Sequence, residues 1–174
     1  NVKVRGGWGE VMLSSLLDQM LAPSQYKSQV QIKKNSKERV DFAVVMPGKD
    51  EKEVYLPIDS KFPLEDYNRL VEASETMDKD AIEHAQKQLV KRIKEEAKSI
   101  KEKYISVPDT TDFAVMFLPI EGLYAEVVRD VELMETLQNQ YKIVVCGPTT
   151  LTALLNSLQL GFKTLAIQKR SSEV

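Results

Sequence analysis

The sequence has very few of the residues that mark disulfide-bonded, zinc-binding or membrane proteins. Among its 174 residues there is one cysteine, Cys146, and one histidine, His84. A single cysteine excludes an intramolecular disulfide and a multi-cysteine zinc site, and it suits a reducing cytoplasm, where we expect the protein to act. Because neither an apolar run of about eighteen residues nor a secretory signal is present, we expect no membrane contact by this domain.

An excess of basic residues is also missing. The chain has 24 Lys and Arg against 26 Asp and Glu, a net charge of −2, which argues against coating nucleic acid through bulk positive charge and leaves only a local basic patch open. With 43% hydrophobic and 29% charged residues it is soluble and globular, and its length predicts a single domain over residues 1–174. It begins at Asn1 without methionine and stops at Val174 with no terminating signal, so we expect a domain excised from a longer chain.

The most informative segment is Ile58-Asp59-Ser60-Lys61, in which an apolar strand ends in a carboxylate and an ammonium two residues apart. Alternate side chains of an extended strand share a face, so Asp59 and Lys61 should project together. A metal ligand beside a lysine that activates water has this arrangement. Two interpretations stay open from the residues alone: a metal-binding pair, or a surface pair on an edge strand, where charges discourage unwanted pairing.

A β-hairpin is predicted to bring a second carboxylate to this pair. Two apolar segments, residues 42–45 and 54–58, flank the turn-rich run of residues 47–52, which puts the midpoint of the hairpin at Asp50. Residues whose numbers sum to about 100 then face each other, so Asp41 lies opposite Asp59, with Cβ atoms about 4.5–5.5 Å apart. Two carboxylates at that spacing can hold one Mg²⁺, and apolar neighbours on both faces make unpaired charges there costly.

The remaining periodicities predict a mixed α/β fold around the hairpin. Helices are expected over residues 10–21, 64–73, 79–104 and 124–139 and through Leu158, the last with a threonine hydroxyl available as its N-cap, and further strands over residues 26–32, 113–119 and 143–146. The apolar strand at 113–119 should be central and buried. Cys146 is expected in the core. For Trp8 a core anchor is the prediction, with stacking on a base as the alternative.

The long helix at 79–104 carries a stripe of lysines on the side away from its apolar face. Its members are Lys87, Lys91, Lys94, Lys98 and Lys101. Each lies three or four residues from the next, so the stripe is continuous. It is either a solvated helix face or a ridge that contacts DNA phosphates, and intervening glutamates weaken its positive potential. His84 has no second histidine nearby, which predicts a surface residue rather than a metal ligand.

Several motifs, taken as a set, resemble those of a known family. They are Gly6-Gly7-Trp8-Gly9-Glu10, Val40-Asp41, Pro57-Ile58-Asp59-Ser60-Lys61-Phe62-Pro63-Leu64, Met116-Phe117-Leu118-Pro119-Ile120-Glu121 and Gly147-Pro148-Thr149-Thr150-Leu151. Together they resemble the conserved domain of the RmuC family of DNA recombination proteins, over almost the whole chain. The order of elements resembles the PD-(D/E)XK nuclease superfamily. The resemblance implies an α/β, restriction-endonuclease-like fold: a mixed sheet flanked by helices, with an αβββαβ core and an extra C-terminal helix and strand.

The resemblance also implies roles for individual residues. Asp41 and Asp59 match the two metal-binding acids, Lys61 the catalytic lysine, and Glu10 a helix carboxylate that some members use as a further ligand. The cofactor would be Mg²⁺ or Mn²⁺, and the reaction metal-assisted hydrolysis of phosphodiester bonds. Two roles stay open for Glu10, a metal ligand or a favourable charge in the first turn of its helix. Glu121, after the central strand, is either a further site acid or a loop acid.

By this resemblance the chain is part of a bacterial protein of DNA recombination that limits inversions at short inverted repeats. We expect a divalent-metal-dependent DNA nuclease that acts on recombination intermediates or structured DNA, with DNA and recombination proteins as partners. Family members typically add an N-terminal membrane-anchoring segment and a coiled coil, through which a homo-oligomer would form. Two alternatives dispense with catalysis: a domain that binds DNA structures and keeps its acids as remnants, and a scaffold for recombination proteins.

Overall fold

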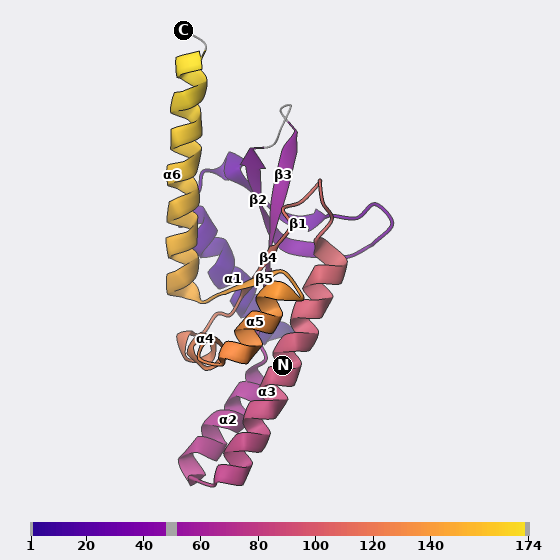
Figure 1. Ribbon diagram of the computed structural model, residues 1–174, viewed down its shortest axis with the longest axis vertical. Helices are drawn as coiled ribbons and strands as arrows, with labels where there is room; N and C mark the ends of the chain where they lie inside the picture. The colour runs from indigo at the N-terminus through magenta and orange to yellow at the C-terminus, as the bar shows by residue number, and fades with distance from the viewer. Residues whose placement is uncertain (1, 48–51, 173–174) are drawn as a thin grey trace.

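A five-stranded mixed sheet runs through the middle of the protein (Figure 1). The computed structural model describes the backbone of residues 2–47 and 52–172 and the side chains of residues 7–47 and 52–171, so the predicted hairpin midpoint at Asp50 lies outside the described residues. In spatial order the strands are β1 (Tyr26–Gln31), β2 (Arg39–Pro47), β3 (Glu53–Ser60), β4 (Ala114–Phe117) and β5 (Ile143–Cys146). The first three strands are antiparallel, and β3, β4 and β5 are parallel. The predicted mixed α/β sheet is confirmed.

Helices cover both faces of the sheet. They are α1 (Val2–Met20), α2 (Leu64–Thr76), α3 (Lys79–Tyr104), α4 (Glu121–Val128), α5 (Val131–Asn139) and α6 (Pro148–Ser172), with a short 3₁₀ turn, η1 (Pro23–Gln25), before β1. Apolar residues of α1 and α6 pack with β2, β3 and β4 on one face, and α2 to α5 form a second core on the other. Figure 1 shows α6 rising past the sheet at one end and the α2–α3 hairpin extending from the other.

The alternating pattern of the central strands explains why both faces are covered. Leu56 and Ile58 of β3 belong to the core under α1 and α6, and neighbouring Val115 and Phe117 of β4 join them, whereas Met116 faces the α3 side. The predicted apolar face of α3 is buried as expected, from Ala85 through Leu89, Ile93, Ala97 and Ile100 to Tyr104. A sheet of this kind leaves little room for charges, so those it holds need partners.

The first helix begins earlier than its periodicity indicated. It starts at Val2 rather than near Glu10 and runs through the three glycines of residues 6–9. Glu10 therefore lies in the middle of α1, no acidic residue stands in its first turn, and a helix-terminal charge is the wrong interpretation of Glu10.

The single helix predicted over residues 124–139 is two helices. The chain breaks after α4 at Arg129, and Asp130 caps α5 by accepting a hydrogen bond of 3.0 Å from the Leu133 backbone N–H. Aspartate favours such caps because its short side chain satisfies a helix N–H that otherwise has no partner. The apolar spacing continues across the break, which is why periodicity alone joined the two helices.

Removing this cap should cost stability. We expect Asp130→Ala to lower the free energy of unfolding by about 1 kcal/mol, the usual value of an N-cap side chain, in urea denaturation. Asp130→Asn is the matched control, since asparagine caps about as well. A loss of the same size in both variants would show that the charge of Asp130 matters and its cap does not.

The start of α6 differs from the predicted threonine N-cap. Gly147 occupies the cap position, and Thr150 accepts a hydrogen bond of 2.7 Å from its N–H, which is one half of a capping box. Glu121 of α4 caps a second free N–H of this helix end, by accepting a hydrogen bond of 2.7 Å from the Thr149 N–H. A Cβ on Gly147 would meet the Glu121 carboxylate at 3.0 Å, so glycine permits this approach. Glu121 thus caps α6 and is neither a loop residue nor a site acid.

Candidate active site

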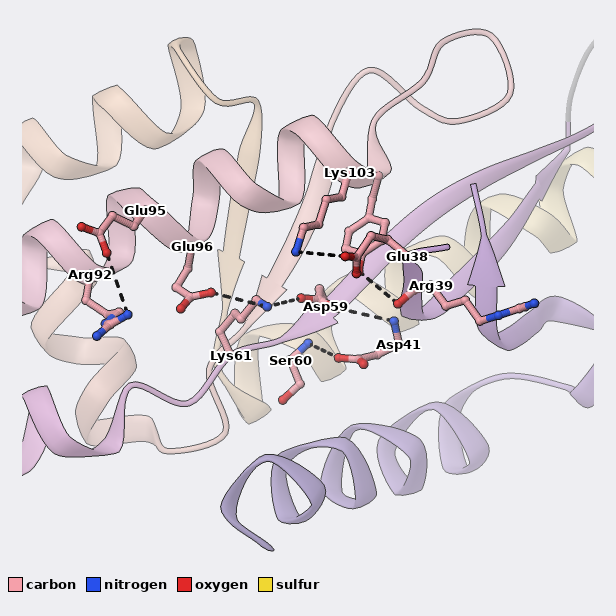
Figure 2. Close-up of polar contacts among 11 residues, drawn as sticks. Glu38, Arg39, Asp41, Asp59, Ser60, Lys61, Arg92, Glu95, Glu96 and Lys103 are labelled. Atoms are coloured by element: carbon pink, nitrogen blue, oxygen red, sulfur yellow. Dashed lines mark hydrogen bonds and ion pairs between the residues drawn. The ribbon is translucent and has the colours of Figure 1, made fainter. Parts of the chain in front are cut away.

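The two predicted acids meet where β3 leaves β2 for β4. Phe42 pairs with Ile58, so the residue numbers sum to 100 as predicted, and one further step puts Asp41 opposite Asp59. The ladder between β2 and β3 ends at Ile58, whereas on its other edge β3 pairs with β4 from Ile58 to Ser60 and the Lys61 N–H donates to the Phe117 carbonyl at 2.9 Å. The carboxylates occupy the gap this leaves. Asp41 accepts 2.8 Å from the Ser60 N–H, and the Asp41 N–H lies 3.5 Å from the Asp59 carboxylate (Figure 2).

Lys61 joins the acids from the same strand. Its Nζ lies 2.9 Å from Oδ2 of Asp59, which confirms that the two side chains project together. Since β3 is flanked by β2 and β4 and Asp59 is only 4% exposed, the interpretation as a surface pair on an edge strand is wrong.

A residue that the sequence analysis missed holds Lys61 from the other side. Glu96 of α3 has its carboxylate 3.4 Å from the Lys61 ammonium (Figure 2). In the sequence it was one of the glutamates thought to weaken the lysine stripe. Its position three residues after Ile93 and four before Ile100 puts it at the border of the apolar face, which is the signal that could have marked it.

The electrostatics of the site are those of acids forced together. Burial, and then the charge of Asp59, raise the pKa of Asp41 to about 8, although the Ser60 N–H opposes the shift. Burial lowers the pKa of Lys61, but the attraction and hydrogen bond of Asp59, followed by those of Glu96, outweigh it and leave that pKa above its usual range. Lys61 therefore stays protonated at neutral pH. The carboxylates repel each other, and a divalent cation between them would remove this cost.

The donor set fits a magnesium or manganese ion. Mg²⁺ is usually held by one or two carboxylates and completes its shell with water and phosphate oxygens, and Asp41 and Asp59 supply such a pair. Glu10 is exposed on α1, and its charge contributes to the raised pKa of Asp41. Across residues 2–47 and 52–172, however, no group of three or more acidic, histidine or cysteine side chains is arranged to hold a metal, so Glu10 faces the pair without completing a ligand set.

Helix α1 approaches the acids closely at Gly9. A Cβ added there would stand 2.6 Å from Oγ of Ser60 and 3.4 Å from Pro119, so a larger residue at this position would have to displace the Ser60 hydroxyl. Figure 2 shows α1, in indigo, on one side of the acids and α3 on the other. Trp8, the residue before Gly9, is 45% exposed and its ring centroid lies 5.7 Å from that of Phe62. The prediction of a core anchor for Trp8 is therefore wrong.

The lysine stripe lies on another flank of α3. Lys87, Lys91, Lys94 and Lys98 line a groove of about 460 Å³ together with Tyr141, and Lys101 donates 2.8 Å to the Gln140 carbonyl. Glu96 is two residues from Lys94 and from Lys98, which is about 200° around a helix. The stripe and the acids therefore face opposite sides of α3, and one DNA segment that runs straight through the acids does not follow the stripe.

The remaining single residues behave as predicted. Cys146 is buried, and burial raises the pKa of its thiol to about 11, which makes it a poor nucleophile. His84 is exposed on α3. None of the described helices is both long and apolar enough to span a membrane.

Comparisons with known proteins identify the family of the chain. A sequence model of the RmuC family matches residues 1–174. The chain is 56% identical, over its full length, to the DNA recombination protein RmuC homolog of Xylella fastidiosa strain Temecula1, of which it covers 39%. It is 29% identical to the DNA recombination protein RmuC of Escherichia coli strain K12, with 90% of this chain and 33% of that protein aligned.

A more distant relative, the DNA recombination protein RmuC homolog of Chlamydia muridarum, is 28% identical over 98% of this chain and 38% of its own length. The chain thus spans about two-fifths of the length of its relatives from Xylella fastidiosa and Chlamydia muridarum. No solved structure matches it. The match of the family model to every residue, together with these relatives, shows that the chain belongs to the RmuC family.

Proposed function

We propose that this chain is the nuclease domain of a DNA recombination protein and that it hydrolyses phosphodiester bonds in recombination intermediates or structured DNA with Mg²⁺ or Mn²⁺. One observation carries the proposal: Asp41, Asp59 and Lys61 converge at the point where β2 and β3 part. The names of its relatives support the link to DNA recombination.

Each residue has a distinct part in this chemistry. Asp41 and Asp59 would hold the metal, which when bound polarises the scissile phosphate and acidifies a coordinated water. The raised pKa of Lys61 keeps it charged, so it is suited to stabilise the developing negative charge or to orient the water rather than to accept a proton. Glu96 holds the ammonium in place from α3.

Glu96 gives a test of positioning. We expect Glu96→Gln to slow cleavage by about tenfold and to leave metal affinity unchanged, because Lys61 loses one of the two carboxylates that fix it. The matched control is Glu95→Gln, whose carboxylate is 3.8 Å from Arg92 at the surface. Equal rates for the two variants would exclude a positioning role for Glu96.

The direct test of the nuclease is a substrate panel. Labelled single-stranded, duplex, hairpin and branched DNAs of one length are incubated with the protein and Mg²⁺, Mn²⁺ or EDTA. The proposal predicts cleavage of at least one structured substrate that requires the metal. A folded protein that cleaves none of them in either metal contradicts it.

The lysine groove favours a second candidate, a domain that binds DNA structures without cutting them. Four lysines along one groove beside Tyr141 are suited to the phosphates of a strand. We expect the double variant Lys91→Glu with Lys94→Glu to weaken DNA binding. The slope of log K against log salt concentration should become shallower by about two, because about two phosphate contacts are lost. The control is Lys79→Glu with Lys163→Glu, which makes the same charge change at exposed positions elsewhere. Equal weakening of DNA binding in the two double variants would show that the net charge of the protein matters and the groove does not.

A further inference from the structure

Trp8 is an exposed aromatic ring in an unusual place. It is the only tryptophan of the chain and is 45% exposed, although tryptophan is on average strongly buried. The apolar residues that follow it on α1, Leu13 and Leu17, are fully buried. Its ring lies against Phe62 at a centroid distance of 5.7 Å and a tilt of 42°, and Phe62 is itself partly buried against the core. The Trp8 ring thus packs against Phe62, while much of its surface stays exposed to solvent.

Two neighbouring contacts place the ring near the candidate active site. Along α1 it precedes Gly9, whose backbone lies against Ser60, the residue that donates its N–H to Asp41. Just beyond the end of β3 at Ser60, its partner Phe62 follows Lys61 directly. Neighbouring Cα atoms are about 3.8 Å apart, so both routes lead from the ring to the acids and the lysine within two residues. Trp8 therefore lies close to the acids and the lysine and is not a remote patch.

We propose that Trp8, supported by Phe62, stacks on an unpaired base of the nucleic acid strand whose backbone enters the site at Asp41 and Asp59. A strand with free bases presents a flat aromatic face next to its phosphates, and exposed aromatic rings beside a backbone site are how proteins hold single strands. The bases of an intact duplex are stacked on one another and offer no such face. The substrate class is then DNA with an unpaired nucleotide at the scissile position, such as a single strand, a frayed end or a branch point. This inference rests on the proposed function for the identity of the bound polymer.

The sole tryptophan makes the test direct. The protein is titrated in EDTA, where no cleavage occurs, with an unlabelled oligothymidine and with a blunt-ended duplex of equal length, and its intrinsic fluorescence is followed. The proposal predicts quenching by the single strand and little change with the duplex. In parallel, anisotropy of a labelled oligothymidine should show a roughly 5- to 100-fold loss of affinity in Trp8→Ala, the effect expected for one stacked base. Trp8→Phe should restore most of it.

Val11→Ala is the matched control, because Val11 is another exposed apolar residue on α1, 68% open, and it has no place in the proposed stack. Thermal melting checks that each variant is folded. Absence of quenching by the single strand, equal quenching by the duplex, or equal loss of affinity in Val11→Ala and Trp8→Ala overturns the proposal. Because the titration needs no metal, stacking without any cleavage in the substrate panel would refute only the nuclease, and cleavage that is indifferent to Trp8 would refute only the stacking.

Discussion

Asp59→Asn should lose at least about 100- to 1,000-fold of any metal-dependent DNA cleavage while the protein remains folded. Asp59 faces Asp41 across the gap between β2 and β3 and lies 2.9 Å from Lys61, so the variant removes half of the charge that would hold the metal and the main partner of the lysine. Asparagine has nearly the same shape and keeps an oxygen that can face the Asp41 N–H. The measurement is the initial rate of cleavage of the best substrate at saturating Mn²⁺.

The control for this variant is Asp112→Asn, the same chemical change at an exposed position before β4. It should cleave at the rate of the wild type. If Asp59→Asn also cleaved at that rate, the carboxylate pair would not be the catalytic centre. That result would favour a domain that binds DNA structures or a scaffold for recombination proteins.

Asp41→Asn should stabilise the metal-free protein in alkaline solution. In the folded chain the pKa of Asp41 is raised to about 8 from an ordinary 3.8, chiefly by burial and by Asp59. Between these two values the folded state binds a proton that the unfolded state has released, so the free energy of unfolding falls as the pH rises through this window and the loss is complete above it. The neutral asparagine removes this dependence and still accepts the Ser60 N–H.

Urea denaturation in EDTA at pH 5, 7 and 9 measures the effect. We expect the variant to gain on the wild type with rising pH and to exceed it by about 1–3 kcal/mol at pH 9, because a shift of one pKa unit corresponds to about 1.4 kcal/mol. Parallel pH profiles for the two proteins would show that Asp41 carries no such repulsion. Asp41 would thus lower the stability of the metal-free protein while serving to bind the metal, which is a common trade-off between stability and function.

The site could be predicted from the sequence where it depends on short-range geometry. The hairpin register follows from apolar segments placed symmetrically about one turn, and strand alternation then puts Asp59 and Lys61 on one side, as the structure confirms. Glu96 could not be found in this way because it reaches Lys61 from a helix 35 residues further along the chain, and only the packing of α3 on the sheet brings them together.

Three predictions from the sequence were wrong because they depended on local patterns alone. Trp8 was expected in the core because of its large apolar surface, but its ring packs on the partly buried Phe62 and stays 45% exposed. The break at Asp130 was hidden by apolar spacing that continues from α4 into α5. Glu121 looked like an acid at the end of a strand, and its role as the cap of α6 depends on a contact across 28 positions of sequence. The cap at Asp130 is a local contact that apolar spacing does not reveal, whereas the role of Glu121 depends on a tertiary contact.

If Asp41 and Asp59 form a divalent-metal site, calorimetric titration of the protein with Mn²⁺ at pH 8 should show one binding site per chain in the wild type. This site should be lost in both Asp41→Asn and Asp59→Asn and kept in Asp112→Asn. Mn²⁺ binding of equal affinity in the wild type and in both site variants, or no binding to a folded wild-type protein, would show that these acids do not form a metal site.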